Sequence, residues 1–365
     1  MKTITEILGG AQGLFDISFD LQSCFEETLI DQQKTFLHIL RCVEEHLPTL
    51  YRSYSGTGRK PYQYLPFFRS QLAKCYFQID TTSKIIGRLK ADPNLRLLCG
   101  FTKVPGKASF SRAYCYLGEI EMVQEILKRL AKETFKDKVV YHICRDSTAI
   151  DARETVKQEK DKKDEKEAKK RGRPPKDEGK REKQPTEMEK QVTSSPHDSL
   201  EKLNKNCSFG CKKNSQGNIS YWKGYKLHLD VSDSGFPITA CVTGANVHDS
   251  MLAIPMEKIT EQKVTFCYSL MDPAYDAQTI VDFIRSRERV PIIEPNKRKD
   301  KNRPPLDPAK QERYKIRTTV ERANSHLKDN LIPKTLYVKG HTKIAFVLFS
   351  AVLCLAALKH LSFLC

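Results

Sequence analysis

The first 135 residues carry apolar side chains at the three- and four-residue spacing that is typical of amphipathic helices. Phe36, Ile39, Leu40 and Val43 form one such stripe within residues 29–47, and residues 80–101 and 109–135 continue the pattern. Pro93 and the segment KVPGKAS interrupt it. We therefore expect residues 1–135 to form an all-α N-terminal domain of several short helices.

After residue 138 the pattern changes to that of strands. The segment KVVYHICRDSTAI is apolar and β-branched, and we expect its strand to end at Asp146. Residues 224–232, GYKLHLDVS, alternate with Tyr225, Leu227, Leu229 and Val231 on one face. The turn SDSG and the segment FPITACVTGANV then complete an antiparallel hairpin.

A charged stretch separates these strands. Residues 155–195 contain almost no apolar side chains and cannot bury a core, so we expect disorder there. Order should return near Tyr221. The sequence thus predicts a charged, disordered insertion over residues 155–220.

The rest of the chain alternates helices and strands. We expect a helix at 251–259, a strand ending at Asp272, a helix at 277–287, a strand at 290–296 and an amphipathic helix at 312–328. The order βββαβαβα predicts an α/β fold with a mixed sheet flanked by helices. This order matches an RNase H-like catalytic core, which we place at residues 136–365.

One segment raises the question of a membrane. Residues 344–358 read IAFVLFSAVLCLAAL. Fifteen residues at about 1.5 Å each span roughly 22 Å, which is short of the ~30 Å hydrocarbon core of a bilayer. We therefore favour a buried core helix over a membrane span.

Charge and cysteine content narrow the function. Lys and Arg number 62 against 45 Asp and Glu, a formal charge of +17. An excess of this size favours a polyanionic partner, first of all nucleic acid, and the basic helical domain at 1–135 becomes a candidate DNA-binding domain of helix-turn-helix type. Any small helical domain of a basic protein would show the same pattern.

The 12 cysteines have no regular spacing, and the N-terminus lacks an apolar signal segment. We expect reduced thiols and a cytoplasmic protein that joins the nucleoid when bound to DNA. Cys207 and Cys211 lack the second close pair that a structural zinc site needs.

Two aspartates come at the ends of apolar strands. Asp146 follows VVYHICR and Asp272 follows FCYSLM. Carboxylates at the carboxyl edge of a sheet often face a ligand crevice, whereas the simpler interpretation is turn chemistry. Asp151 is a rival to Asp146, but it lies five residues further on and should fall beyond the strand.

The last amphipathic helix carries a more specific pattern. Tyr314, Arg317, Glu321 and Lys328 fall at offsets of 0, 3, 7 and 14 residues, which places them on one ridge within an arc of about 60°. A separate stripe should be buried: Ile316, Val320, Ala323 and Leu327. Without the two aspartates, a solvated face with an Arg317–Glu321 pair would explain the ridge equally well.

With these residues the sequence resembles the DDE transposases of bacterial insertion sequences, in the subgroup named for a Tyr-Arg-Glu-Lys signature. Tyr314, Arg317, Glu321 and Lys328 meet that signature in full. The segments RDSTAIDAR and LMDPAYDAQ are similar to the family's two Asp motifs, although PA at 273–274 departs from the usual second motif. The resemblance covers about residues 60–360 without the charged insertion.

The resemblance implies a metal-dependent phosphoryl-transfer site. Asp146, Asp272 and Glu321 would be catalytic and would hold two Mg²⁺ (or Mn²⁺) ions, which prefer carboxylate oxygens and act on both oxygens of the displacement. It also implies that Arg317 and Lys328 contact DNA phosphates and that Tyr314 holds the terminal phosphate or a base. The partners would be transposon ends and target DNA, bound by a homodimer, with no membrane.

Two further regions outside the signature residues are candidates for DNA contact. The segment KKRGRPPK resembles an AT-hook, in which Arg171 and Arg173 would enter a narrow minor groove, while a solubilising linker is the alternative. Lys223 lies beside the single tryptophan, Trp222, which could stack on a base or pack in the core.

Two other functions remain open from the sequence. Another RNase H-like nuclease would share the three carboxylates but would need neither Tyr314 nor Lys328. A non-catalytic DNA-binding derivative of a transposase would not need the carboxylates, whose presence counts against it.

Overall fold

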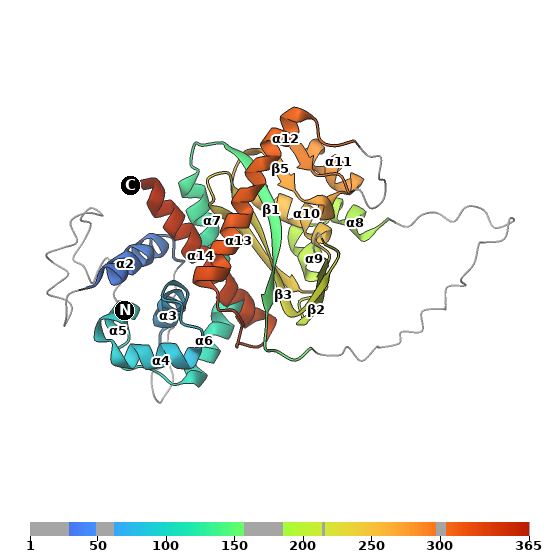
Figure 1. Ribbon diagram of the computed structural model, residues 1–365. Helices are drawn as coiled ribbons and strands as arrows, with labels where there is room; N and C mark the ends of the chain where they lie inside the picture. Colours follow the sequence, from blue (N-terminus) through green and yellow to red (C-terminus); the bar gives the residue numbers. More distant parts are fainter. Residues whose placement is uncertain (1–28, 49–61, 157–184, 214–215, 297–303, 365) are drawn as a thin grey trace.

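Helices pack on both faces of a central sheet in the computed structural model, which describes residues 29–48, 62–156, 185–213, 216–296 and 304–364 (Figure 1). The expected N-terminal helices are present within these ranges. They are α2 (Asp31–Glu44), α3 (Leu65–Tyr76), α4 (Thr82–Ala91), α5 (Pro93–Cys99), α6 (Lys107–Glu119) and α7 (Met122–Thr134). The stripe expected in the first of them, from Phe36 to Val43, is buried.

The sheet is mixed, as the sequence predicts. Its strands are β1 (Val140–Asp151), β2 (Ser208–Lys213), β3 (Ile219–Ser232), β4 (Pro237–Gly244), β5 (Phe266–Met271) and β6 (Val290–Ile293). They lie in the order β2-β3-β1-β5-β6, and β4 also pairs with β3. β1 runs antiparallel to β3 and parallel to β5. This confirms an α/β fold consistent with an RNase H-like core behind a helical N-terminal region.

Each face of the sheet is covered by its own helices. α10 (Ala253–Glu261) and α11 (Gln278–Ser286) lie on one face, with the short helix α8 (Glu187–Thr193) against both. On the other face α13 (Thr318–His326) packs on β1 and β3, and α14 (His341–Leu364) packs on β4 (Figure 1). The part of β3 from Tyr225 to Ser232 is therefore covered on both sides. Its polar residues are paired there: Lys226 donates to Asp249 just before α10, and Asp230 accepts from Thr260 of α10.

The apolar segment 344–358 is confirmed as a core helix. α14 contacts α2, α3, α6 and α7 as well as β4. Its length and composition alone would suit a membrane span, but most of it is buried inside the protein. Because α14 touches both the N-terminal helices and the sheet, their apolar residues form one hydrophobic cluster.

The insertion is shorter than the sequence predicts. Residues 157–184, which include the AT-hook-like segment, lie outside the described residues. The prediction was wrong for most of the remainder, since residues 187–213 form α8, α9 (Pro196–Glu201) and β2. Met188 packs on the α10–α11 side, and Lys258 of α10 donates to the carbonyls of Gln191, Val192 and Ser194 at 2.9, 2.8 and 2.6 Å. A few tertiary contacts thus order a segment whose own composition is polar.

Candidate active site

Parallel pairing of β1 and β5 brings Asp146 and Asp272 together. Cys144 of β1 pairs with Leu270 of β5, so two residues further along each strand Asp146 comes beside Asp272. Asp272 directly follows β5 and accepts a hydrogen bond from the Ala274 amide at 3.0 Å. Asp146, by contrast, does not end its strand. β1 continues to Asp151 because β3 pairs with it over that whole length.

Asp146 is held by two side chains of the last helix. Arg317 Nη2 lies 3.3 Å from Asp146 Oδ1, and Asn324 Nδ2 donates to Asp146 Oδ2 at 3.0 Å. Burial raises the pKa of Asp146 to about 6; Arg317 opposes this rise and Asp272 adds to it. Burial also raises the pKa of Asp272, again against the charge of Arg317. The two carboxyls therefore share a partly dry site in which a cation is strongly favoured.

Arg317 supplies that cation in this structure. Its Nη1 donates to Glu321 Oε1 at 2.6 Å, so one guanidinium bridges Glu321 and Asp146. Glu321 is half exposed, whereas Arg317 is largely covered. Arg317 thus joins Asp146 to Glu321, while the charge of Arg317 also acts on Asp272.

The carboxylate oxygens of the site are the type of ligand that a hard divalent ion prefers. Asp146 and Asp272 offer oxygen donors in a site that stabilises positive charge, as Mg²⁺ or Mn²⁺ requires. Among the described residues, however, no group of three or more His, Cys, Asp and Glu side chains is arranged to hold a metal ion. Glu321 would first have to leave Arg317 to join the pair.

The predicted ridge falls on a helical run beside Asp146 whose winding changes along its length, whereas the sequence predicted one amphipathic helix over residues 312–328. It runs through α12 (Pro308–Tyr314), a 3-10 turn η4 (Lys315–Arg317), α13 and a π turn η5 (Leu327–Leu331). Val320, Ala323 and Leu327 are buried on the opposite side, while Ile316 is half-buried. Tyr314 at the start of the ridge donates to Glu294 Oε2 at 3.4 Å. Its burial raises the pKa of the Tyr314 hydroxyl.

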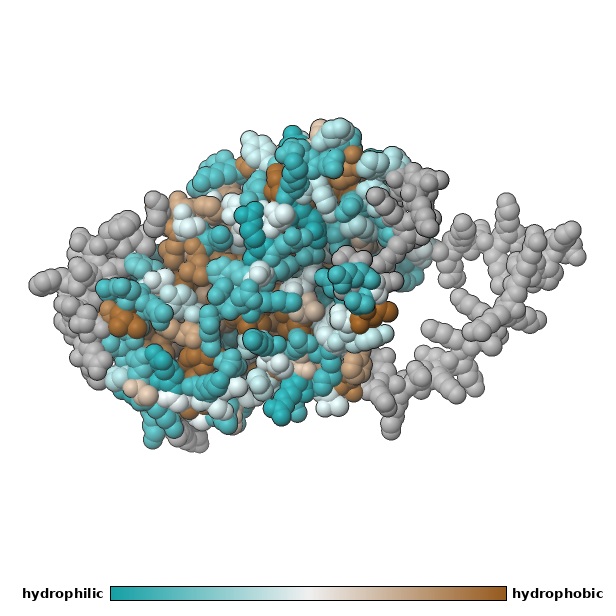
Figure 2. Space-filling view, viewed as in Figure 1, coloured by the Kyte–Doolittle hydropathy of each residue, from teal (hydrophilic) through white to brown (hydrophobic). Residues whose placement is uncertain are grey.

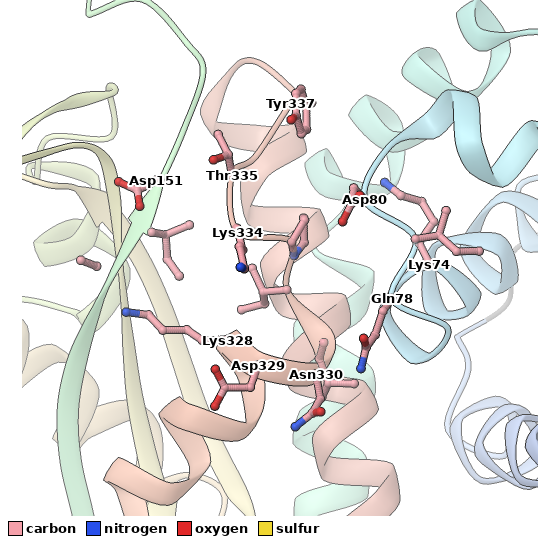
Figure 3. Close-up of a pocket in the computed structure, with 16 residues that line it drawn as sticks. Lys74, Gln78, Asp80, Asp151, Lys328, Asp329, Asn330, Lys334, Thr335 and Tyr337 are labelled. Carbon is pink, nitrogen blue, oxygen red and sulfur yellow. The ribbon is translucent and has the colours of Figure 1, made fainter.

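Lys328 ends the ridge at a pocket of about 740 Å³ between the sheet and the N-terminal helices. Figure 3 shows its amine extending toward β1, where Asp151 lies. Lys74 and Gln78 line the other wall, at the end of α3. Partial burial, and then the nearby charge of Lys212, lower the pKa of Lys328. The pocket therefore connects the ridge with the helical N-terminal region.

Two residues near the site were missed from the sequence. Asn324 lies three positions after Glu321 and four before Lys328, so it belongs to the same ridge, and its spacing was a usable signal. Lys212 of β2 carries one of the charges that oppose the raised pKa values of Asp146 and Asp272. No local pattern pointed to Lys212, because it falls in the predicted insertion.

A buried ion network supports the site from the other face of the sheet. Arg145, next to Asp146, is fully buried and donates to both Asp230 oxygens at 2.6 and 2.7 Å. It also donates to Glu257 Oε2 at 3.1 Å and to the Ala253 carbonyl at 2.7 Å. One guanidinium thus ties β1 to β3 and α10, which positions the strand that carries Asp146.

The remaining predicted DNA contacts do not belong to the last helix. Lys223 is on β3, paired with Phe209 of β2, in a two-stranded part of the sheet. Arg171 and Arg173 lie outside the described residues.

Two family models match the chain. The model for the transposase DDE domain matches residues 138–355, more than half of the chain. A second family model, described as a transposase domain (DUF772), matches residues 26–114. Neither the curated proteins nor the solved structures give a match. The first match covers Asp146, Asp272 and the whole ridge.

Proposed function

Because the chain belongs to the family of transposases with a DDE domain, we propose that it binds the terminal inverted repeats of its own mobile element and there cuts and joins DNA. The two matching family models support a transposase of the insertion-sequence type. The proposal adds the Tyr-Arg-Glu-Lys subgroup, the terminal repeats and the strand-transfer step. Two DNA ends must be held together for joining, so we include a homodimer in it.

One observation carries the proposal. The parallel pairing of β1 and β5 brings Asp146 beside Asp272, and a single arginine, Arg317, joins Asp146 to Glu321. Proteins of this family generally use divalent metal ions, and Asp146, Asp272 and Glu321 are the residues that would hold them here. Such ions activate an oxygen nucleophile and stabilise the leaving oxygen of a phosphodiester.

The chain's own residues prepare this chemistry. Asn324 holds Asp146 in place through its second oxygen. Arg317 neutralises the carboxyl pair until DNA arrives, and a phosphate would compete with Glu321 for its guanidinium. That exchange would free Glu321 to join the aspartates and leave Arg317 on the DNA, as the subgroup signature implies. Lys328 and Tyr314, at the two ends of the ridge, would then flank the bound strand.

The test is cleavage and joining of a duplex that carries the inverted repeat found on both sides of the coding region, with a plasmid as target. Wild-type protein should cut the end and join it to the plasmid. Asp146→Asn and Asp272→Asn should bind the duplex and leave it uncut, while Asp151→Asn, on the same strand as Asp146, should keep activity. Loss of activity in Asp151→Asn with full activity in Asp146→Asn would refute the assignment.

The same assay separates the alternatives. An RNase H-like nuclease would cut the duplex and give no joined plasmid product. A non-catalytic derivative would bind the repeat and do neither.

A further inference from the structure

β2 and β3 form a two-stranded ribbon that extends past the body of the sheet. β3 pairs with β1 as far as Gly224 and with β4 as far as Tyr225. β2 pairs with β3 from Gly224 onward to Ile219. The ribbon comprises residues 208–213 and 219–223.

The ribbon's two faces differ. On one face Trp222 lies across from Gly210, where a Cβ atom would overlap the indole ring, so the backbone must carry glycine there. The other face, which we call the outer face, carries the cross-strand pairs Phe209–Lys223 and Cys211–Tyr221, together with Ile219.

The outer face is apolar and exposed. Tyr221 is 73% exposed, Phe209 63% and Ile219 55%. Figure 2 shows hydrophobic residues among hydrophilic ones at the edge of the molecule where Figure 1 draws β2. Exposed aromatic side chains gathered on one small surface are typical of a binding site.

The charge of the ribbon identifies the kind of partner. Residues 207–224 contain three lysines and no Asp or Glu. One of the lysines, Lys223, lies across from Phe209 and two residues from Tyr221 on the outer face. Aromatic rings beside a lysine are an arrangement on which single-stranded DNA stacks its bases and pairs its phosphates. The ribbon begins where Gly224 of β3 pairs with Asp151 of β1, and Lys328 of the ridge extends toward that part of β1, so the ribbon lies beside the Lys328 end of the ridge.

We propose that the outer face of the β2–β3 ribbon binds the single-stranded DNA that adjoins the cut at the element end. Phe209 and Tyr221 stack on unpaired bases, and Lys223 contacts a phosphate between them. This inference rests on the proposed function, because it takes its ligand from the DNA that is cut at Asp146 and Asp272.

The experiment compares two probes with the full-length protein: the inverted-repeat duplex with blunt ends, and the same duplex with a single-stranded extension. The double variant Phe209→Ala/Tyr221→Ala should bind the extended probe about tenfold more weakly, the loss expected for at least one aromatic stack. Its affinity for the blunt probe should stay within about twofold of wild type. Tyr141→Ala, an equally exposed tyrosine (62%) on β1, is the matched control and should bind both probes as wild type does.

Trp222 provides an internal reporter, since it is the only tryptophan of the chain and lies in the ribbon. Its emission should change with the extended probe more than with the blunt one, and its spectrum without DNA verifies that a variant is folded. A second variant, Lys223→Ala, should lower the salt dependence of binding to the extended probe by a log–log slope of about 0.7.

Two outcomes would overturn the inference while leaving the proposed function intact: unchanged affinity of the double variant for the extended probe, or an equal loss on both probes. A variant that changes only the oligomeric state would assign the surface to a subunit contact and also overturn it. The proposed function would fail separately, if wild-type protein neither cut nor joined the repeat or if Asp146→Asn remained active.

Discussion

Replacing Arg145 by methionine should destabilise the protein by about 3 kcal/mol or more, because it removes the only guanidinium that reaches both Asp230 and Glu257 among the described residues. Methionine fills a similar volume, so the loss reports the charge. All three side chains are fully buried. Glu257 keeps Arg289 at 3.1 Å. Asp230 keeps the Thr260 hydroxyl at 2.6 Å, with no second guanidinium or ammonium bonded to it among the described residues. The magnitude follows from leaving a buried carboxylate without its cation, which costs about 3–5 kcal/mol.

The assay is urea denaturation followed by the fluorescence of Trp222, which lies on the strand that carries Asp230. The matched control is Arg129→Met, which breaks an exposed pair with Glu125 at 2.8 Å and should cost no more than about 1 kcal/mol. Equal free energies of unfolding for the two variants would refute the reasoning.

The pH dependence gives the prediction a second, independent check. Burial already raises the pKa of Glu257, against the charges of Arg145 and Arg289. Removing Arg145 should raise it further in the folded state, above its value in the unfolded chain. A folded-state pKa that is raised in this way costs stability at high pH, and the cost disappears as the pH falls below the unfolded value. The defect of Arg145→Met should therefore be larger near about pH 8 than near about pH 5.

Four further predictions concern the site and the core. Glu321→Gln should abolish cleavage and leave binding of the inverted-repeat duplex unchanged, whereas Glu312→Gln, an exposed residue of α12 paired with Lys315, should cleave normally in the same assay. Lys328→Ala should weaken duplex binding and lower its log–log salt slope by about 0.9, measured by anisotropy over a salt series; an unchanged slope would remove Lys328 from the DNA contacts. Chelation of divalent ions should stop cleavage but not binding, and added Mg²⁺ or Mn²⁺ should restore it; activity that persists in chelator would contradict the metal-dependent reaction. Leu353→Ala in α14 should cost about 2–5 kcal/mol in urea denaturation, and a smaller loss would show that the helix is not a core element.

The amino-acid sequence alone determined features that depend on local geometry. The ridge and the buried stripe of the last helix follow from 100° of rotation per residue, and Val320, Ala323 and Leu327 are buried as predicted. The apolar composition of residues 344–358 is local too, but the helix that contains them is 24 residues long, so its place in the core follows from its packing and not from its length. The order of strands and helices was readable from local patterns, and with it the fold class.

Only the tertiary structure decided how the distant parts meet. Asp146 and Asp272 are 126 residues apart, and they become neighbours only through the parallel register of β1 and β5, which no local pattern encodes. Asp146 lies inside its strand because β3 extends the pairing to Asp151. The polar segment from α8 to β2 becomes ordered because Lys258 and the α10–α11 surface bind it. Pairing across a sheet and packing between helices depend on contacts between residues far apart in the chain, so they exist only once the whole chain has folded.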